Sequence, residues 1–345
     1  MKDNLDFRSD TVTKPTDEMR RAMASADVGD DVLGDDPTVN ELQDYAAGLV
    51  GMESALYVCS GTMGNLTAIL AHTQRGDGIM MGAKSHTWIN ECGGAAGFAG
   101  VMPYPLDDET GIPTVESIRS SFQSSGNVHH APTTLLTLEN THNRSGGIPA
   151  DSETFSLVAG EARSLGLKIH LDGARIFDAV AFFKNDVKEY SLAVDSIQIC
   201  LSKGLCAPMG SVLCGSAEFI GRARKYRKAL GGGQRQSGIA AAAGLIALRD
   251  MRKRLSEDHS NAALLADLLL GIGIDVEPVP RRTNMVYFRT PPAIRDEALF
   301  ERTCAKRGVR LLASGKGRIR MVTHFGIDEP SVRRAVDIIK EVSAQ

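Results

Sequence analysis

Long apolar runs are missing from this sequence of 345 residues. The N-terminus, M-K-D-N-L-D-F-R-S-D, has no apolar core of signal-peptide length, and no later stretch approaches the roughly 20 residues of a membrane span. A large excess of one sign of charge is missing too, with 39 Lys and Arg against 42 Asp and Glu. This balance gives no electrostatic argument for nucleic acid or an anionic membrane as a partner. We therefore expect a cytoplasmic protein that binds neither.

Motifs of several other protein classes are also missing. The six cysteines form no C-x-x-C pair, so we predict neither a disulfide framework nor a metal site. No G-x-S-x-G elbow occurs, which leaves Ser-His-Asp hydrolysis unsupported. No G-x-G-x-x-G follows the first predicted strand, so a dinucleotide-dependent dehydrogenase is poorly supported.

Strand-like apolar runs do recur along the chain, and helix-capable stretches separate most of them. Their ranges are 54–61, 78–82, 99–104, 134–140, 168–172, 196–201 and 211–215. This alternation predicts an α/β fold with a mainly parallel sheet that helices cover on both faces. The close spacing of the last two runs allows one antiparallel or irregular neighbour.

The pattern becomes long and helical from about 235 to 270 and then changes again. Strand-like runs at 283–289, 308–313 and 318–324, with helical stretches at 296–307 and 329–343, predict a small α+β domain. We therefore expect a large domain over 1–250 and a small C-terminal domain over 251–345.

Two strand ends carry the strongest chemical signal. H-L-D-G-A-R (170–175) places Asp172 at the tip of one apolar run, and I-C-L-S-K-G (199–204) places Lys203 at the tip of another. Ligands of open α/β sheets bind beyond the carboxyl ends of the strands. A partly desolvated lysine there is a competent imine-forming amine, and an aspartate can keep a cofactor ring nitrogen protonated. An ordinary loop lysine and a turn aspartate are the plain alternatives.

Other polar residues near strand ends could serve the same crevice. At 59–66, C-S-G-T-M-G-N-L opens a helix whose first amides, with Gly61 and Thr62, could hold a phosphate, although simple helix capping explains the motif equally well. Arg175 could bind a carboxylate or form a surface salt bridge. His86 could stack on a flat ring or move protons, and His129 is a second candidate. The remaining histidines considered, His130, His142 and His259, are predicted to be polar surface residues.

In this order the motifs resemble those of the L-threonine aldolases, among the fold-type I pyridoxal-phosphate enzymes, over nearly the whole chain. The resemblance rests on D-F-R-S-D-T-V-T-K-P (6–15), V-G-D-D-V-L-G-D-D-P-T-V (28–39), S-G-T-M-G-N-L (60–66), L-E-N-T-H-N (138–143), H-L-D-G-A-R (170–175), L-S-K-G-L-C-A-P-M-G-S (201–211), G-G-G-Q-R-Q-S-G (231–238) and R-M-V-T-H (320–324). It implies a mostly parallel seven-stranded sheet and an enzyme that cleaves L-threonine or L-allo-threonine to glycine and acetaldehyde.

The resemblance also implies roles for individual residues. Pyridoxal phosphate would be held as an imine by Lys203, with Asp172 on the ring nitrogen, His86 over the ring, and Gly61 and Thr62 on the phosphate. The substrate carboxylate would be bound by Ser9, Arg175 and Arg320, which brings the segment 1–15 into the site. Such enzymes are homo-oligomers, dimers of dimers, with active sites between subunits, so Arg235 would serve the neighbouring subunit's cofactor.

The sequence is compatible with several alternatives. The base that removes the β-hydroxyl proton is His86, His129 or a water molecule. Leu33 and the segment 87–90 depart from the commoner family pattern, which bears on the preference between threonine and allo-threonine. The rival functions are β-elimination, racemisation or transamination on the same scaffold, and a non-catalytic binding protein of the same fold.

Overall fold

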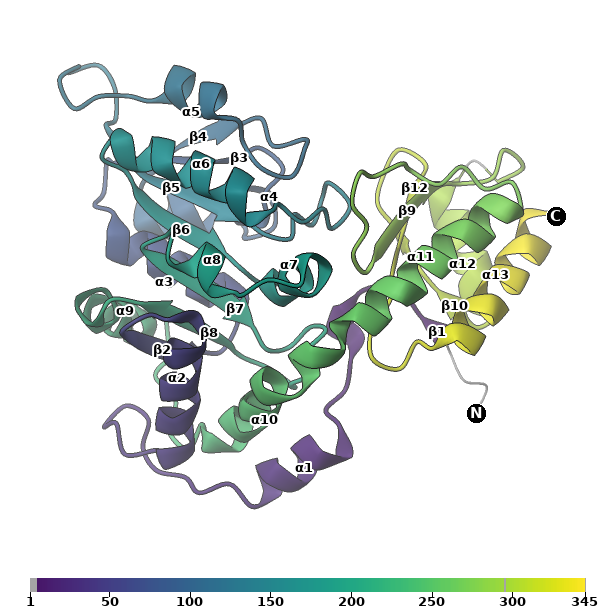
Figure 1. Cartoon of the computed structure of the whole chain (residues 1–345), viewed down its shortest axis with the longest axis horizontal. Coiled ribbons are helices and arrows are strands. Elements are labelled where there is room, and N and C mark those ends of the chain that lie inside the picture. Colours follow the sequence, from purple (N-terminus) through teal and green to yellow (C-terminus); the bar gives the residue numbers. More distant parts are fainter. Residues whose placement is uncertain (1–4, 295, 345) are drawn as a thin grey trace.

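In the computed structural model, which describes residues 5–294 and 296–344, two units of unequal size lie side by side (Figure 1). The larger unit is built on a seven-stranded sheet with the order β2-β8-β7-β6-β5-β3-β4. Its strands are β2 (Ser54–Val58), β3 (Gly78–Gly82), β4 (Met102–Leu106), β5 (Thr133–Glu139), β6 (Lys168–Asp172), β7 (Ser196–Cys200) and β8 (Ser211–Gly215). All seven correspond to predicted apolar runs, and β8 alone runs in the direction opposite to the other six strands.

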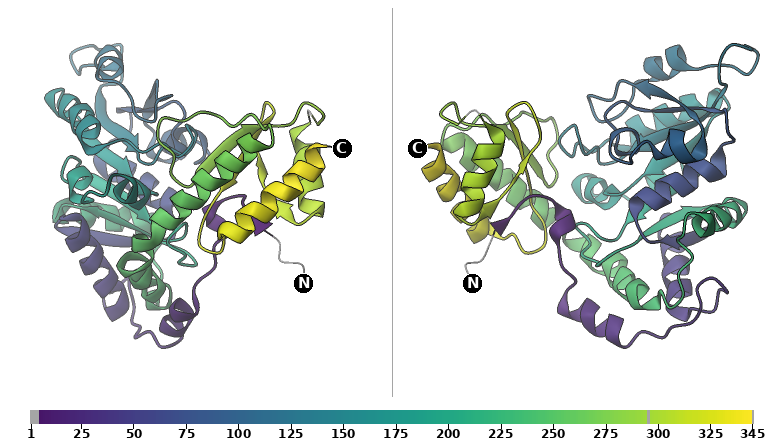
Figure 2. Two further views of the ribbon diagram at one scale, coloured as in Figure 1. Left: turned by 45° about the vertical axis from the view of Figure 1, so that its right-hand side comes forward. Right: turned by 180° about the vertical axis from the view of Figure 1, so that it is seen from behind.

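Helices cover both faces of this sheet (Figures 1 and 2). One face packs against α3 (Gly61–His72), α9 (Ala217–Ala229) and the π-helix η2 (Ala95–Ala99). The other face packs against α2 (Pro37–Val50), α5 (Val115–Ser121) and α6 (Ser152–Ser164), and the short helix α8 (Lys188–Ser191) packs on α2 and α6. The remaining helices of this unit are α1 (Asp17–Ala24), α4 (His86–Ile89), α7 (Ile176–Phe183) and α10 (Gly238–Arg249). Burial on both faces explains why the central strands are apolar throughout.

The smaller unit contains an antiparallel sheet with the order β11-β12-β9 and two long helices. Its elements are β9 (Met285–Arg289), α12 (Glu297–Lys306), β10 (Val309–Arg310), β11 (Leu312–Ala313), β12 (Arg318–Val322) and α13 (Glu329–Ser343). The turn η3 (Met251–Arg254) and the helix α11 (Leu255–Gly271) join it to the larger unit. The predicted boundary after residue 250 coincides with η3, and the division into domains stays a prediction.

The N-terminal segment differs from its predicted place in the larger unit. The strand β1 (Leu5–Asp6) pairs in parallel with β10, and Leu5 and Phe7 belong to the apolar core of the smaller unit. The 3-10 helix η1 (Asp10–Val12) follows, and its first residue, Asp10, accepts hydrogen bonds from Arg175 of the larger unit and Asn284 of the smaller one. No helix among the described residues combines the length and apolarity needed to cross a membrane.

Candidate active site

Asp172 and Lys203 follow neighbouring parallel strands at the same edge of the large sheet. Asp172 is the last residue of β6 and is paired with Gln198 of β7. Lys203 lies three residues beyond the end of β7. Because β6 and β7 are parallel, the apolar runs that form them deliver the acid and the amine to one crevice.

Three donors hold the buried carboxylate of Asp172 in place. Asn65 donates from Nδ2 to Oδ2 at 2.8 Å, and the backbone amide of Ala174 donates to Oδ1 at 3.1 Å. With its side-chain nitrogen turned toward Asp172, Gln198 donates to Oδ1 at 3.0 Å. The acid is thus fixed by β7 and α3 before any ligand binds, which is the preorganisation that a ring-nitrogen partner needs.

An open cavity of about 450 Å³ joins this edge of the sheet to the smaller unit. Five residues predicted from the sequence line it: Ser9, His86, Arg175, Lys203 and Arg320. They come from segments separated by as many as 311 positions in the chain, because Ser9 and Arg320 are the first and last of them. The fold therefore assembles the predicted amine, histidine and arginines in one pocket.

His86 begins the short helix α4 and is held at both its backbone and its ring. Its amide donates to Oε2 of Glu139 at 2.7 Å, and its Nδ1 lies 2.9 Å from Oε1 of Glu91. Burial opposes protonation, but the hydrogen bond to Glu91 and the charges of Asp172 and Glu91 outweigh it and raise the pKa of His86. Polar atoms of His86, Glu91 and Asp172 all lie within 4.8 Å of one another.

The helix α3 begins at Gly61, beside the same strand ends. Ser60 caps it by accepting the amide of Met63 at 3.1 Å, while the side chain of Thr62 is exposed. A Cβ added at Gly61 would lie 2.7 Å from Sγ of Cys200, so only glycine allows the helix to begin this close to β7. The predicted capping and the predicted phosphate site are compatible, because the first amides of a helix have no partner within it.

Arg175 is buried against the N-terminal segment. Its Nε and Nη2 donate to the two carboxylate oxygens of Asp10, each at 2.7 Å. Burial alone would raise the pKa of Asp10, but the charge and hydrogen bonds of Arg175 outweigh it and leave that pKa lowered. The fork of Arg175 is therefore largely occupied, and its Nη1 lies 3.4 Å from Oδ1 of Asn143.

Arg320 reaches the cavity from β12 with more of its donor capacity free. Its Nη2 donates to the carbonyl of Arg8 at 3.0 Å, and its Nη1 lies 3.4 Å from Oδ1 of Asn143. Within the described residues its Nε is buried and has no hydrogen-bond partner. Because Nε has almost no exposed surface, an anionic group in the cavity would meet the terminal nitrogens, of which Nη1 makes only the 3.4 Å contact to Asn143.

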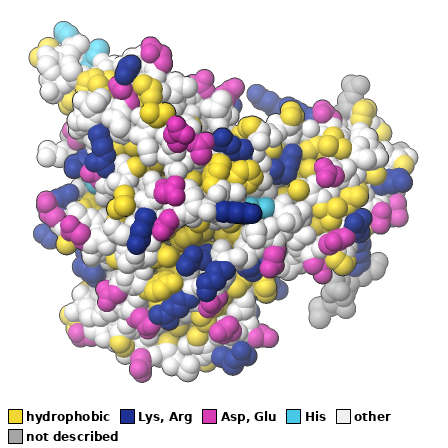
Figure 3. Space-filling model, viewed as in Figure 1, with side chains coloured by type: hydrophobic (Ala, Val, Ile, Leu, Met, Phe, Trp, Pro, Cys, Tyr) yellow, Lys and Arg dark blue, Asp and Glu magenta, His cyan; other side chains and the backbone are white. Residues whose placement is uncertain are grey.

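Two predicted residues do not join this group within one chain. His129 lies in the exposed loop before β5, and Figure 3 shows histidine side chains at the outer tip of the loop between α5 and β5. The seven residues of β5 span about 20 Å, which separates its amino end from the edge with Asp172. His129 thus lies away from the pocket of its own chain, and a catalytic role for it stays a prediction. Arg235 is also exposed, and it pairs with Asp30 at 2.8 Å.

The structure adds residues to the site that the sequence reading did not single out: Asn65, Glu91, Glu139, Asn143 and Tyr287. Asn65 lies within S-G-T-M-G-N-L, and Glu139 and Asn143 lie within L-E-N-T-H-N, so the motifs contained a signal for these three.

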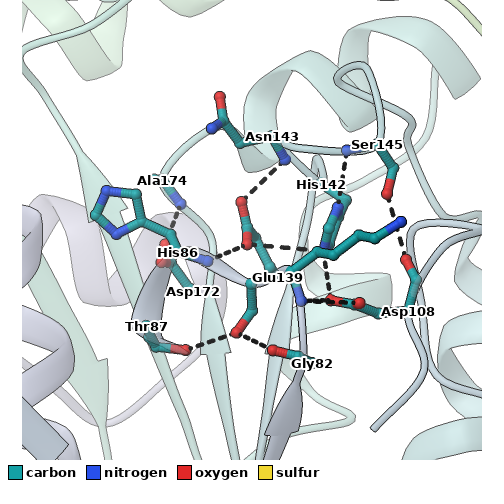
Figure 4. A network of polar contacts seen from close by, with 12 residues as sticks. Gly82, His86, Thr87, Asp108, Glu139, His142, Asn143, Ser145, Asp172 and Ala174 are labelled. Atoms are coloured by element: carbon teal, nitrogen blue, oxygen red, sulfur yellow. Dashed lines mark hydrogen bonds and ion pairs between the residues drawn. The ribbon is translucent and has the colours of Figure 1, made fainter. Parts of the chain in front are cut away.

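The surface placement predicted for His142 is wrong. The residue is 2% exposed, and its Nε2 lies 2.7 Å from Asp108 (Figure 4). A histidine in a polar turn sequence gives no indication of the buried acid that contacts it.

Comparison with known proteins gives a consistent result. The model of the beta-eliminating lyase family matches residues 6–291. The chain is 43% identical over 324 residues to the low specificity L-threonine aldolase of Escherichia coli (strain K12), covering 94% of each chain. It is 41% identical over 345 residues to the probable low-specificity L-threonine aldolase 2 of Arabidopsis thaliana, covering 98% of this chain and 97% of the relative.

Among solved structures, the Leishmania major threonine aldolase superposes with a TM-score of 0.83 and 17% identity, covering 98% of this chain and 99% of the other. At this identity the likeness supports the fold, which matches the predicted fold-type I architecture.

Proposed function

The chain belongs to the beta-eliminating lyase family and, within it, to the L-threonine aldolases, and from this premise we propose how its residues act. The protein is a pyridoxal-phosphate-dependent carbon–carbon lyase. We propose that it cleaves L-threonine and L-allo-threonine to glycine and acetaldehyde. The observation that carries this proposal is the single cavity that joins Lys203 to Arg175 and Arg320 beside the buried Asp172.

The residues present fit the cofactor. Lys203 would hold it, Asp172 would contact its ring nitrogen, and Gly61 and Thr62 at the start of α3 would face its phosphate. When bound, pyridoxal phosphate supplies a ring that accepts the electron pair of the breaking Cα–Cβ bond. The fit rests on the three donors that orient Asp172 and on the close approach of Gly61 to β7.

We propose that Arg320 is the main ligand of the substrate carboxylate. Its terminal nitrogens make only one hydrogen bond, at 3.0 Å to the carbonyl of Arg8, and one longer contact at 3.4 Å to Asn143, whereas Asp10 already occupies two nitrogens of Arg175. Arg175 would contribute positive charge and its Nη1, and Ser9 would contribute its hydroxyl from the rim. Clamping the carboxylate fixes the orientation of the Cα–Cβ bond.

His86 is our candidate for the group that takes the β-hydroxyl proton. Because Glu91 engages Nδ1, the other ring nitrogen is left to exchange a proton in the cavity. This assignment also explains why the helix α4 is held by Glu139 at its first residue.

We further propose a homo-oligomer, a dimer of dimers with shared active sites. Arg235 and His129 are exposed, and Leu33 exposes 72% of its surface, so each is available to a second copy's pocket. The proposed reaction breaks down threonine and forms glycine, and we propose that it takes place in the cytoplasm.

Product analysis after incubation with L-threonine tests the proposed reaction. We expect glycine and acetaldehyde in equal amounts. The second candidate, β-elimination, is favoured by the description of the matching family, and it would give ammonia and 2-oxobutanoate. Ammonia without glycine would overturn the aldolase assignment and leave the pocket assignment standing.

A further inference from the structure

Glu139 is a buried acid at the carboxyl end of β5, in register with Asp172 on β6. Its two carboxylate oxygens accept backbone amides from two different walls of the cavity (Figure 4). Oε2 accepts the amide of His86 at 2.7 Å, and Oε1 accepts the amide of Asn143 at 3.0 Å. One side chain therefore connects the start of α4 to the turn after β5.

Each of these walls carries a different part of the site. The ring of His86 lies with Glu91 and Asp172 on the cofactor side. Asn143 lies on the carboxylate side, where its Oδ1 is 3.4 Å from Nη1 of both Arg175 and Arg320. The carbonyl of Asn143 also accepts the hydroxyl of Tyr287 from the smaller unit at 3.3 Å.

A second buried pair fixes the turn that presents Asn143. His142 Nδ1 accepts the amide of Ser145 at 3.3 Å, so its Nε2 carries the proton that it donates to Asp108 at 2.7 Å. Asp108 in turn accepts the amide of Lys84, close to the start of α4. The segment before α4 and the turn after β5 are thus connected twice, once through Glu139 and once through the pair of Asp108 and His142.

We propose that Glu139 is a positioning residue that sets the spacing between the wall with His86 and the wall with the two arginines. It is not among the described residues that line the cavity, so it acts through the amides of His86 and Asn143. The consequence is that cofactor ring and substrate carboxylate are held in register by one side chain. This inference rests on the proposed function for the identity of the ligands.

The variant Glu139→Gln tests this role. Glutamine has nearly the same shape but only one acceptor oxygen, so one of the two amides would face an NH₂ donor. We expect glycine to bind the holoenzyme about tenfold to a hundredfold more weakly, as for loss of a hydrogen bond to a charged group. We also expect a changed visible absorbance of the bound cofactor, because His86 shifts. Glycine titration followed by absorbance reads both effects without requiring turnover.

Asp195→Asn is the matched control. The carboxylate of Asp195 likewise accepts two donors, the amide of Ile169 at 2.9 Å and Nζ of Lys168 at 3.0 Å, but at the amino end of β6. We expect this variant to melt at a lower temperature while keeping wild-type glycine affinity and cofactor absorbance. A folded Glu139→Gln protein that behaves in the same way would overturn the proposal.

Asn143→Ala decides the matter if Glu139→Gln does not fold. It removes the Oδ1 contacts to both arginines and keeps the amide on Glu139, so we expect weaker glycine binding with unchanged absorbance. Unchanged glycine binding in this variant contradicts the proposal. A wild-type protein that binds pyridoxal phosphate and glycine but does not cleave threonine would sink the proposed function alone, because these tests measure binding.

Discussion

Asn65 connects the buried His170 of the sheet to two acids of the site, Asp172 and Glu91, through hydrogen bonds. Its Nδ2 donates to both Asp172 and Glu91 at 2.8 Å, and its Oδ1 lies 3.1 Å from Nε2 of His170. Nδ1 of His170 in turn lies 2.8 Å from the hydroxyl of Ser196. Burial lowers the pKa of His170 to about 4, so the ring is neutral and donates to Asn65. The orientation of Asp172 thus depends on His170 and Ser196, which are not among the residues that line the cavity.

His170 gives stability a pH dependence of defined sign. Its pKa of about 4 lies below the 6.5 of an unperturbed histidine, so below pH 6.5 the unfolded chain binds a proton that the folded chain does not. Its contribution to stability is therefore lost as pH falls from 6.5 toward 4, by up to about 1.4 kcal/mol per pH unit. In urea unfolding between pH 7 and 5, we expect His170→Gln to show a shallower loss than wild type. Equal slopes would contradict this assignment.

At the scale of secondary structure, the close contact of α3 with β7 brings a helix N-terminus to the edge of the sheet where we propose that the cofactor phosphate binds. The contact requires Gly61, whose absent side chain leaves room for Cys200 and Gln198. The apolar pattern of β7 and the glycine at the start of the helix could be predicted from the sequence, since both follow local rules. The role of Glu139 could not, because it depends on two amides that only the folded chain brings together.

Gly61→Ala tests the helix contact. A Cβ 2.7 Å from Sγ of Cys200 forces α3 away from β7, so we expect the affinity of the apoprotein for pyridoxal phosphate to fall about tenfold or more. The control is Gly221→Ala in α9, where nothing lies within 4 Å of the added Cβ. This control is expected to raise the free energy of unfolding by about 0.5–1 kcal/mol and leave cofactor affinity unchanged. Equal affinities in the two variants would refute the argument.

At the scale of the whole molecule, the pocket is completed by two segments distant in sequence, the N-terminal segment around Asp10 and the strand β12, which lie next to the large sheet. The strand β1 pairs with β10, Asp10 binds Arg175, and Arg320 enters from β12. The motifs at 6–15 and 320–324 indicated these residues only through family resemblance, since no local pattern predicts contacts across some 300 positions. The packing of Leu5 and Phe7 in the core of the smaller unit could not be predicted from local patterns either, because it too joins distant parts of the chain.

The proposed sharing of active sites between subunits can be tested by complementation. A mixed dimer contains one Lys203→Ala subunit and one Arg235→Ala subunit. If Arg235 serves the neighbouring subunit's cofactor, both substitutions fall in the same pocket of this dimer. The other pocket then contains no substitution. After subunit exchange between equal amounts of the two inactive variants, we expect about a quarter of wild-type activity, because half of the dimers are mixed and each has one intact site. No recovery despite mixed dimers in native mass spectrometry would place Arg235 elsewhere.

The central claim, that Lys203 holds the cofactor of a threonine-cleaving enzyme, is tested most directly by the rate of glycine release from L-threonine. The rate is measured for wild type, for Lys203→Ala and for Lys168→Ala as the control. Lys168 is exposed at the opposite end of β6. We predict equal amounts of glycine and acetaldehyde from wild type and the control, and a rate lower by about a thousandfold or more, with no protein-bound cofactor absorbance, for Lys203→Ala. A Lys203→Ala protein that retains both the absorbance and the turnover would contradict the account.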